Sequence, residues 1–220
     1  MEYKLIRAGR RSITIQINDD ATITVRAPLL MPKIFIDKFV NSKQSWILKK
    51  QEHVLKQIPH IKRTYSNGDN YLYLGQNYPL KITNNVRAKL LFTDSFELSE
   101  QLRPKAKHLF EKWYKTRAKE YFDSKLDEAS GVMKVKFSKL HLSSGVRRWG
   151  SYSPRSGTIS LSWRLIMAPK EVIDYVIIHE LCHIIQPNHS KKFWELVAHF
   201  DANYKSSIKW LKNNGRSLSI

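Results

Sequence analysis

The chain has 220 residues, of which 42% are hydrophobic and 11% aromatic, so it is long enough to bury the core of one or two folded domains. Its net charge of +19 attracts polyanions, but the basic residues are spread along the chain and charge alone names no partner. No run of about 18 to 20 apolar residues predicts a membrane span, and no apolar segment near the N-terminus predicts a secretory signal. The single cysteine, Cys182, excludes an intrachain disulfide, and we expect a cytoplasmic protein.

Alternating isoleucines predict a β-hairpin near the N-terminus. The segment SITIQINDDATITVRA, residues 12–27, places apolar side chains at every second position on both sides of Asp19-Asp20. Residues 33–57 then show one apolar helical face with lysines opposite, which predicts an amphipathic helix. A second pair of short strands is predicted in NYLYLGQNYPLKI, residues 70–82, with a turn at Gly75-Gln76.

The polar stretch over residues 83–100 is the expected domain boundary, although AKLLFTDSFELS within it predicts two more strands. We therefore expect a β-rich accessory region, built from hairpins and one helix, over residues 1–100. A second domain is expected over residues 101–220.

The C-terminal domain is expected to combine helices with short strands. A long amphipathic helix is predicted over residues 101–129, followed by β-like segments at 135–143 and 157–165. PKEVIDYVIIHELCHII predicts a helix that starts at Pro169 and ends before Pro187, and HSKKFWELVAHF predicts another helix after it. The expected fold class is α+β, with a small twisted sheet packed on the helix that ends in HELCH.

The helix predicted over residues 170–185 is apolar almost all round, yet it contains His179, Glu180 and His183. Buried ionisable side chains are costly unless they pair or bind a metal. Residues four apart lie one above the other on a helix, so His179 and His183 can direct a ring nitrogen at one point. Two imidazoles placed in this way are typical of a zinc site.

Glu180 is turned by about 100° around the helix axis from the first histidine, so it can flank a metal without binding it. From there it can accept a proton from a metal-bound water, as in the H-E-x-x-H pattern of metalloproteases. A catalytic zinc needs a third protein ligand and one open position. His189 follows the helix break at Pro187-Asn188 and is the expected third ligand. Glu195 and His199, on the next predicted helix, are the alternatives.

Two longer segments around this helix carry a more specific pattern. RRWGSYSPRSGTISLSWRL contains W-G-S and then G-x-I-x-L-x-W-x-L, and VIDYVIIHELCHIIQPNHSKKFW contains H-E-L-x-H and a later N-H-S-x-x-F-W. Together with RSITIQI, VRAP and WILKK near the N-terminus, they resemble the YgjP-like family of zincin-type metallopeptidases.

The resemblance implies one family domain over about residues 10–210, an alternative to the division at residue 100. It also implies that His179, His183 and His189 bind zinc and that Glu180 is the general base. Tyr152 stands where the family usually has cysteine after W-G-S, and whether it alters substrate preference stays open.

Other side chains near the pattern have simpler interpretations. We expect Cys182 to be a small core residue that points away from the two helical histidines. Tyr175, one turn before His179, is expected in the core or in support of the site, and Trp149 and Trp163 are expected to pack. The strand TISLSWR, residues 158–164, is the expected border of the cleft, where an extended substrate could pair.

We therefore expect a zinc-dependent metallopeptidase with one zinc ion per chain, which hydrolyses a peptide or protein substrate through a metal-activated water. One alternative is a DNA-dependent protease that acts on DNA-bound proteins, since the H-E-x-x-H-x5-H spacing also resembles SprT-like proteases and the charge is +19. The other alternative is a nucleic-acid-binding module with a structural zinc, which requires a fourth protein ligand. No membrane partner is expected.

Overall fold

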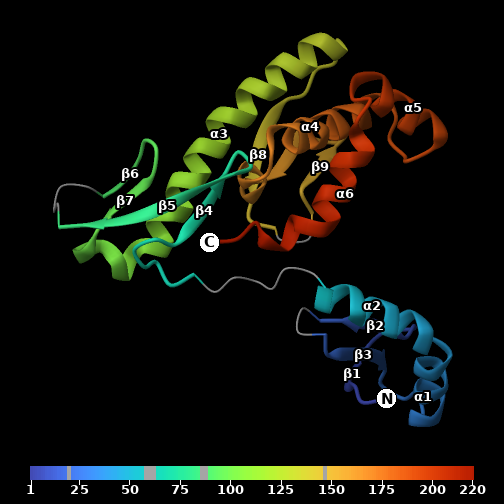
Figure 1. Cartoon of the computed structure of the whole chain (residues 1–220). Helices are drawn as coiled ribbons and strands as arrows, with labels where there is room; N and C mark the ends of the chain where they lie inside the picture. Colours follow the sequence, from blue (N-terminus) through green and yellow to red (C-terminus); the bar gives the residue numbers. More distant parts are fainter. Residues whose placement is uncertain (19–20, 57–62, 85–88, 146–147) are drawn as a thin grey trace. The chain divides into compact units, whose positions relative to one another are not determined.

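The computed structural model describes residues 1–18, 21–56, 63–84, 89–145 and 148–220. The chain divides into two compact units, Met1–Pro59 and His60–Ile220, which are called unit 1 and unit 2. Figure 1 shows the helices and strands of both units, and each unit has its own hydrophobic core. Both combine helices with small sheets, which confirms the α+β class.

Unit 1 contains a three-stranded sheet with the order β1-β3-β2. The predicted hairpin is confirmed: β2 and β3 are antiparallel, and Ile17 pairs with Ile23. Its turn residues, Asp19 and Asp20, lie outside the described residues. Strand β1, which the sequence analysis did not predict, pairs in parallel with β3. The strands are β1 (Lys4–Ala8), β2 (Thr14–Ile17) and β3 (Ile23–Pro28).

The single helix predicted for residues 33–57 is instead two helices, α1 (Lys33–Ser42) and α2 (Gln44–Lys56), separated at Lys43. A straight helix of that length would extend about 37 Å, whereas a strand of six residues spans about 20 Å. The break lets both helices bury apolar side chains in one small core. That core consists of Ile23, Val25, Ala27, Ile36, Val40 and Ile47.

Unit 2 begins with a four-stranded sheet of order β4-β5-β7-β6. The predicted hairpin over residues 70–82 is confirmed, with the turn at Leu74-Gly75, one residue earlier than expected. Both turn residues have positive φ, 49° and 81°, as a two-residue hairpin turn requires. The strands are β4 (Asn70–Tyr73), β5 (Gln76–Thr83), β6 (Leu90–Phe92) and β7 (Phe96–Ser99).

The division between the units differs from the expected boundary at residue 100. The two strands predicted in AKLLFTDSFELS do form, and β7 pairs in parallel with β5, where Leu80 lies opposite Phe96. Tyr71, Phe96 and Phe110 are fully buried together in the core of unit 2. Strands that share a core with the following helix cannot belong to a separate domain, so residues 63–100 belong with the C-terminal elements.

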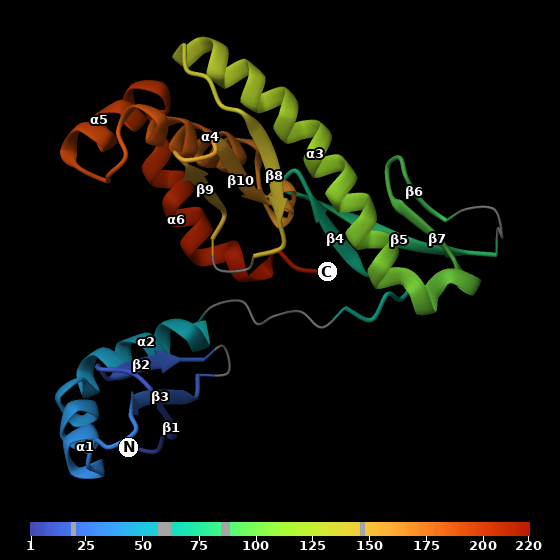
Figure 2. The same cartoon turned by 180° about the vertical axis from the view of Figure 1, so that it is seen from behind.

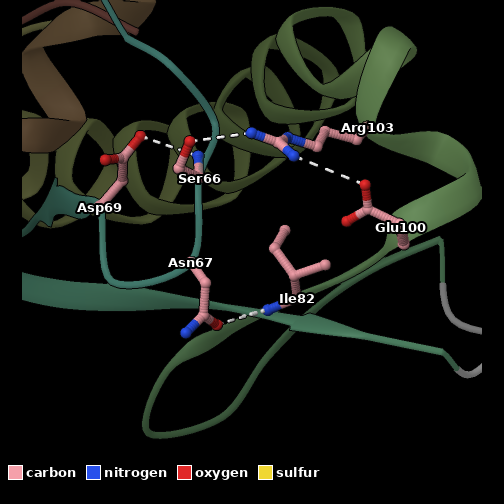
Figure 3. A network of polar contacts seen from close by, with 6 residues as sticks. All are labelled: Ser66, Asn67, Asp69, Ile82, Glu100 and Arg103. Atoms are coloured by element: carbon pink, nitrogen blue, oxygen red, sulfur yellow. Dashed lines mark hydrogen bonds and ion pairs between the residues drawn. The ribbon is translucent and has the colours of Figure 1, made fainter.

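A short helix and a long helix follow the first sheet: η1 (Glu100–Lys105) and α3 (Ala106–Met133). Figure 3 shows how a turn ties η1 to the sheet: Arg103 donates to Ser66 Oγ at 2.9 Å, and Asn67 Oδ1 accepts from the Ile82 backbone N–H at 3.0 Å. The apolar side of α3 is buried from Phe110 to Leu126. Helix α3 therefore joins the four-stranded sheet to the elements that follow (Figure 1).

The second sheet of unit 2 has the order β8-β10-β9 and packs on two helices that also contact each other: β8 contacts α3, and β9 contacts α4 (Figure 2). The two predicted strand segments form β8 and β10, which are parallel. Strand β9 was not predicted, and it pairs antiparallel with β10. The elements are β8 (Lys139–Ser143), β9 (Gly150–Ser153), β10 (Thr158–Ser162), η2 (Trp163–Met167) and α4 (Lys170–Ile185).

The C-terminal segment packs on α4 and on Trp149, the residue before β9. Its elements are α5 (Lys191–Phe200), α6 (Tyr204–Asn214) and η3 (Gly215–Ser217). A Cβ atom at Gly215 would lie 2.8 Å from Trp149 Cζ2, so the chain approaches this indole closely, and Leu218 is buried beyond it. Trp149 therefore packs, as predicted. Across the part of the chain that the structure describes, every helix is too short or too polar to cross a bilayer.

Candidate metal centre and its carboxylate

Helix α4 carries the histidine pair and is held by contacts with α3, α5, α6 and β9. Pro169 precedes the helix and packs closely on Gly75, in the turn between β4 and β5. A Cβ atom added to Gly75 would lie only 2.8 Å from Pro169 Cα. Val172, Ile173 and Ile177 are at most 3% exposed, as expected for an apolar helix. A helix so enclosed gives its side chains little freedom to change direction.

His179 and His183 lie one turn apart on α4, with their ring centroids 5.0 Å apart. Burial, followed by the nearby His183 and His189, lowers the pKa of His179 to about 4. Burial, followed by His189, also lowers the pKa of His183. The site thus favours neutral imidazoles, which is the form that binds metal ions.

His189 reaches the pair because the chain turns back after α4. The Gln186 amide donates to Asn188 Oδ1 at 3.0 Å and to Ser190 Oγ at 3.2 Å, which closes the turn. His189 Nε2 then lies 3.1 Å from His179 Nε2. The chain reversal brings a residue ten positions away to the same point as the helical pair.

The three histidines each offer a ring nitrogen, and these atoms lie within 4.8 Å of one another. Two nitrogen ligands at 2.0–2.1 Å from a tetrahedral zinc are about 3.4 Å apart, close to the 3.1 Å between His179 and His189. Among the described residues, this is the one group of three or more potential metal-binding side chains. The residues present therefore fit a metal ion with nitrogen ligands.

Glu195 and His199, the alternatives for the third ligand, lie on α5 and are not part of this group. Both are exposed, and Glu195 forms an ion pair with Lys191 at 3.6 Å. Only His189 of the three is brought beside the helical pair.

Glu180 lies against β9 and is only 4% exposed. A Cβ atom on Gly150 would be 2.5 Å from Glu180 Oε1, so this approach requires glycine. Burial raises the pKa of Glu180 to about 7, and a hydrogen bond from the Tyr152 backbone N–H partly offsets that effect. Its Oε2 has no hydrogen-bond partner among the described residues. A buried carboxylate oxygen without a partner is costly and is characteristic of a functional site.

Gly150 is the site residue that the sequence analysis missed. The W-G-S segment was noted as part of the family pattern, but no role was assigned to its glycine. The signal was the glycine itself, since an isolated glycine in a strand often marks a close approach. The contact from Tyr152 to Glu180 comes from the backbone, so it does not depend on whether residue 152 is tyrosine or cysteine.

Two further side chains of α4 behave as predicted. Cys182 is fully buried, and burial raises the pKa of its thiol to about 12, which keeps it protonated in the core. Tyr175 is 7% exposed, and its Oη lies 3.4 Å from His179 Nδ1. The contact occupies Nδ1 and leaves Nε2 to face the other histidines. Trp163 is buried, as expected for a packing residue.

An H-E-x-x-H pattern on a helix is characteristic of metallopeptidases. A model of the YgjP-like metallopeptidase domain matches residues 11–214, so the chain belongs to the YgjP-like metallopeptidase family. The protein is therefore a metallopeptidase, a hydrolase of peptide bonds. The metallopeptidase zymogen of Pyrococcus abyssi abylysin, a crystal structure, shows 22% identity over 42% of this chain and 97% of that chain, with a TM-score of 0.38. Among curated proteins, none matches the chain.

Proposed function

We propose that the protein is a zinc-dependent peptidase in which His179, His183 and His189 bind one zinc ion per chain and Glu180 is the general base. The observation that carries the proposal is the convergence of three imidazoles whose ring nitrogens lie within 4.8 Å of one another. The residue after His179 on the same helix, Glu180, is a buried carboxylate whose Oε2 has no hydrogen-bond partner among the described residues. This donor set is the one that catalytic zinc sites use.

A catalytic rather than a structural metal is favoured by the number of ligands. Structural zinc sites are closed by four protein ligands, whereas catalytic sites have three and one open position. Within the described residues, the group contains three histidines and no fourth histidine, cysteine or carboxylate. When bound, zinc polarises a carbonyl oxygen and lowers the pKa of water.

Glu180 is proposed to move the proton. Glu180 follows His179 on α4, and the position of its carboxylate is held by the close approach to Gly150. From there it accepts a proton from the attacking water and delivers it to the amine nitrogen when the peptide bond breaks. The unpartnered Oε2 supports this role, because it has a free lone pair for that proton.

An extended peptide is the substrate that the sheet fits best. The sequence analysis expected residues 158–164 to pair with substrate, but this was wrong, because β10 is the central strand and pairs on both sides. Strand β9 forms the edge of the sheet. The Ser162 N–H donates to Trp149 O at 2.8 Å, so by alternation the backbone groups of Gly150 and Tyr152 point away from β10. The Tyr152 N–H already donates to Glu180, so a substrate strand can pair with the Gly150 backbone and the Tyr152 carbonyl at this edge.

The first test measures zinc content and peptidase activity of the wild type and three variants. We expect about one zinc per chain in the wild type and its loss in His183→Ala, because one ligand is removed. Glu180→Gln is expected to keep the zinc and to lose about 10²- to 10⁴-fold in activity, because the general base is gone. His199→Ala, an exposed histidine outside the group, is the control and should change neither value.

The wild type without zinc, or Glu180→Gln with full activity, would contradict the proposal. The same assay with and without DNA distinguishes the DNA-dependent alternative, for which the charge of +19 is the supporting observation. Activity that depends on DNA, and that falls steeply as salt is raised, would favour that alternative.

A further inference from the structure

His189 differs from the other two histidines in how it is held. His179 and His183 are half-buried on α4, whereas His189 is exposed on the turn between α4 and α5. The Gln186 side-chain amide donates to Asn188 and Ser190, on either side of His189, but these hydrogen bonds do not involve the imidazole ring. The imidazole therefore needs another contact to keep Nε2 directed at the pair.

That contact is an aromatic stack. The ring of His189 lies on the indole of Trp194, with centroids 5.7 Å apart and planes 23° apart. The same indole also stacks with Tyr204 on α6, with ring centroids 5.5 Å apart and planes 19° apart. These distances and angles are those of offset-stacked aromatic pairs.

Trp194 is itself fixed at the beginning of α5. Its backbone N–H donates to Ser190 O at 3.2 Å, so the main chain of Trp194 is tied to the turn that carries His189. It meets Phe193 edge-to-face at 5.2 Å and 90°. Phe193 is fully buried and contacts all three histidine rings, at centroid distances of 4.6–4.9 Å. Phe193 thus packs against all three histidine rings, whereas Trp194 stacks on His189, the exposed one of the three.

We propose that Trp194, backed by Tyr204, is a positioning residue that holds the His189 imidazole in its metal-binding orientation. This inference rests on the proposed function, in which His189 is a ligand. Without the stack, the exposed ring would occupy several rotamers, and binding would have to select one of them. Groups that orient a metal ligand contribute about 10- to 100-fold to metal affinity.

The test is the zinc dissociation constant of the full-length chain, measured by competition with a chromophoric chelator. We expect Trp194→Ala to weaken zinc binding by about 10- to 100-fold. Trp194→Phe is expected to restore binding to within about threefold of the wild type, because a smaller ring can still stack. Tyr204→Ala should have an intermediate effect, because it removes the backing and leaves the Trp194 side chain in place.

The matched control is Trp210→Ala. Trp210 lies on α6, the helix that carries Tyr204, and packs partly buried against the same core. Its removal should lower thermal stability without changing the zinc dissociation constant. A general loss of packing would affect both tryptophan variants alike, so a change specific to Trp194→Ala identifies positioning.

A double-mutant cycle with His189→Ala tests the route by which Trp194 acts. If Trp194 acts through His189, then Trp194→Ala weakens zinc binding in the wild type and has no further effect in His189→Ala. Equal effects in both backgrounds, or wild-type affinity in Trp194→Ala, would overturn the positioning role while His189 remains a ligand. No loss of affinity in His189→Ala would overturn the ligand set, and the positioning role with it.

Discussion

The two units differ in how many apolar side chains they bury. Among the described residues, the core of unit 1 contains six buried apolar residues, whereas the core of unit 2 contains 28, of which eight are aromatic, such as Phe110 and Trp163. Large apolar side chains remain exposed in unit 1. They are Met1, Leu29, Leu30, Ile34, Phe35, Trp46 and Leu48.

The difference follows from size and has a consequence for the site. A small unit buries a smaller fraction of its surface, so it tolerates fewer cavities and holds side chains less rigidly. Unit 2, by contrast, packs α4 against α3, α5, α6 and β9 and can hold a buried carboxylate and three histidines in one arrangement. The chemistry lies where the packing is extensive enough to offset the cost of buried polar groups.

Removal of zinc should have the largest effect and should act mainly on unit 2. A ligand present at 1,000 times its dissociation constant stabilises the folded state by about 4 kcal/mol, so a chelator should lower the free energy of unfolding by that amount. Hydrogen exchange is the measurement, with faster exchange expected in peptides from α4 and the turn at His189. Equal changes in peptides from α1 would contradict the assignment of the metal to unit 2.

Gly150→Ala should reduce peptidase activity by about 10²-fold or more, because the added Cβ displaces the Glu180 carboxylate that it would meet at 2.5 Å. Zinc content should stay the same, because the three histidines are untouched. The control is Gly145→Ala, where an added Cβ meets nothing closer than Ser143 Oγ at 3.8 Å. Full activity in Gly150→Ala would show that Glu180 can act from another position.

Ile47→Ala should destabilise unit 1 by about 2–5 kcal/mol, because it opens a cavity in a core of only six buried residues. Urea unfolding followed by hydrogen exchange measures the loss, and zinc content should not change. Leu30→Ser is the control: Leu30 is 95% exposed, so the effect should lie within about 0.5 kcal/mol. Loss of zinc from Ile47→Ala would show that the two cores are coupled.

Gly75→Ala should destabilise unit 2 by about 2–3 kcal/mol, because its φ of 81° is unfavourable for alanine and its Cβ would lie 2.8 Å from Pro169 Cα. Gly68→Ala is the matched control, with a φ of 86° but open space around the Cβ, so only the backbone cost of about 1 kcal/mol applies. Thermal unfolding of both variants gives the comparison. Equal losses would mean that the contact with Pro169 contributes nothing.

Regular patterns within one element could be predicted from the sequence with good accuracy. The alternation around Asp19-Asp20 predicted the hairpin of β2 and β3, and the apolar surface of residues 170–185 predicted a buried helix. The spacing of His179 and His183 predicted a shared direction on that helix, and their rings are adjacent. Such features depend on residues at most a few turns apart, and local geometry decides them.

Features that join distant segments could not be predicted in this way. The break at Lys43 depends on the size of the sheet beneath the helices, and the unit boundary depends on the pairing of β5 with β7. Strand β9 is short and polar, so it has no periodic signal of its own, and it forms because β10 offers an edge. Periodicity carries no information about which elements come together.

The class of chemistry follows from the order of residues alone: an apolar helix with H-E-x-x-H, a helix break and a further histidine. How these groups are supported depends on contacts between segments that are far apart in the chain. Gly150 meets Glu180 across 30 residues of chain, and Tyr204 backs Trp194 from another helix. A helix determines the directions of its side chains through local backbone geometry, whereas burial and stacking arise only when separate elements pack together.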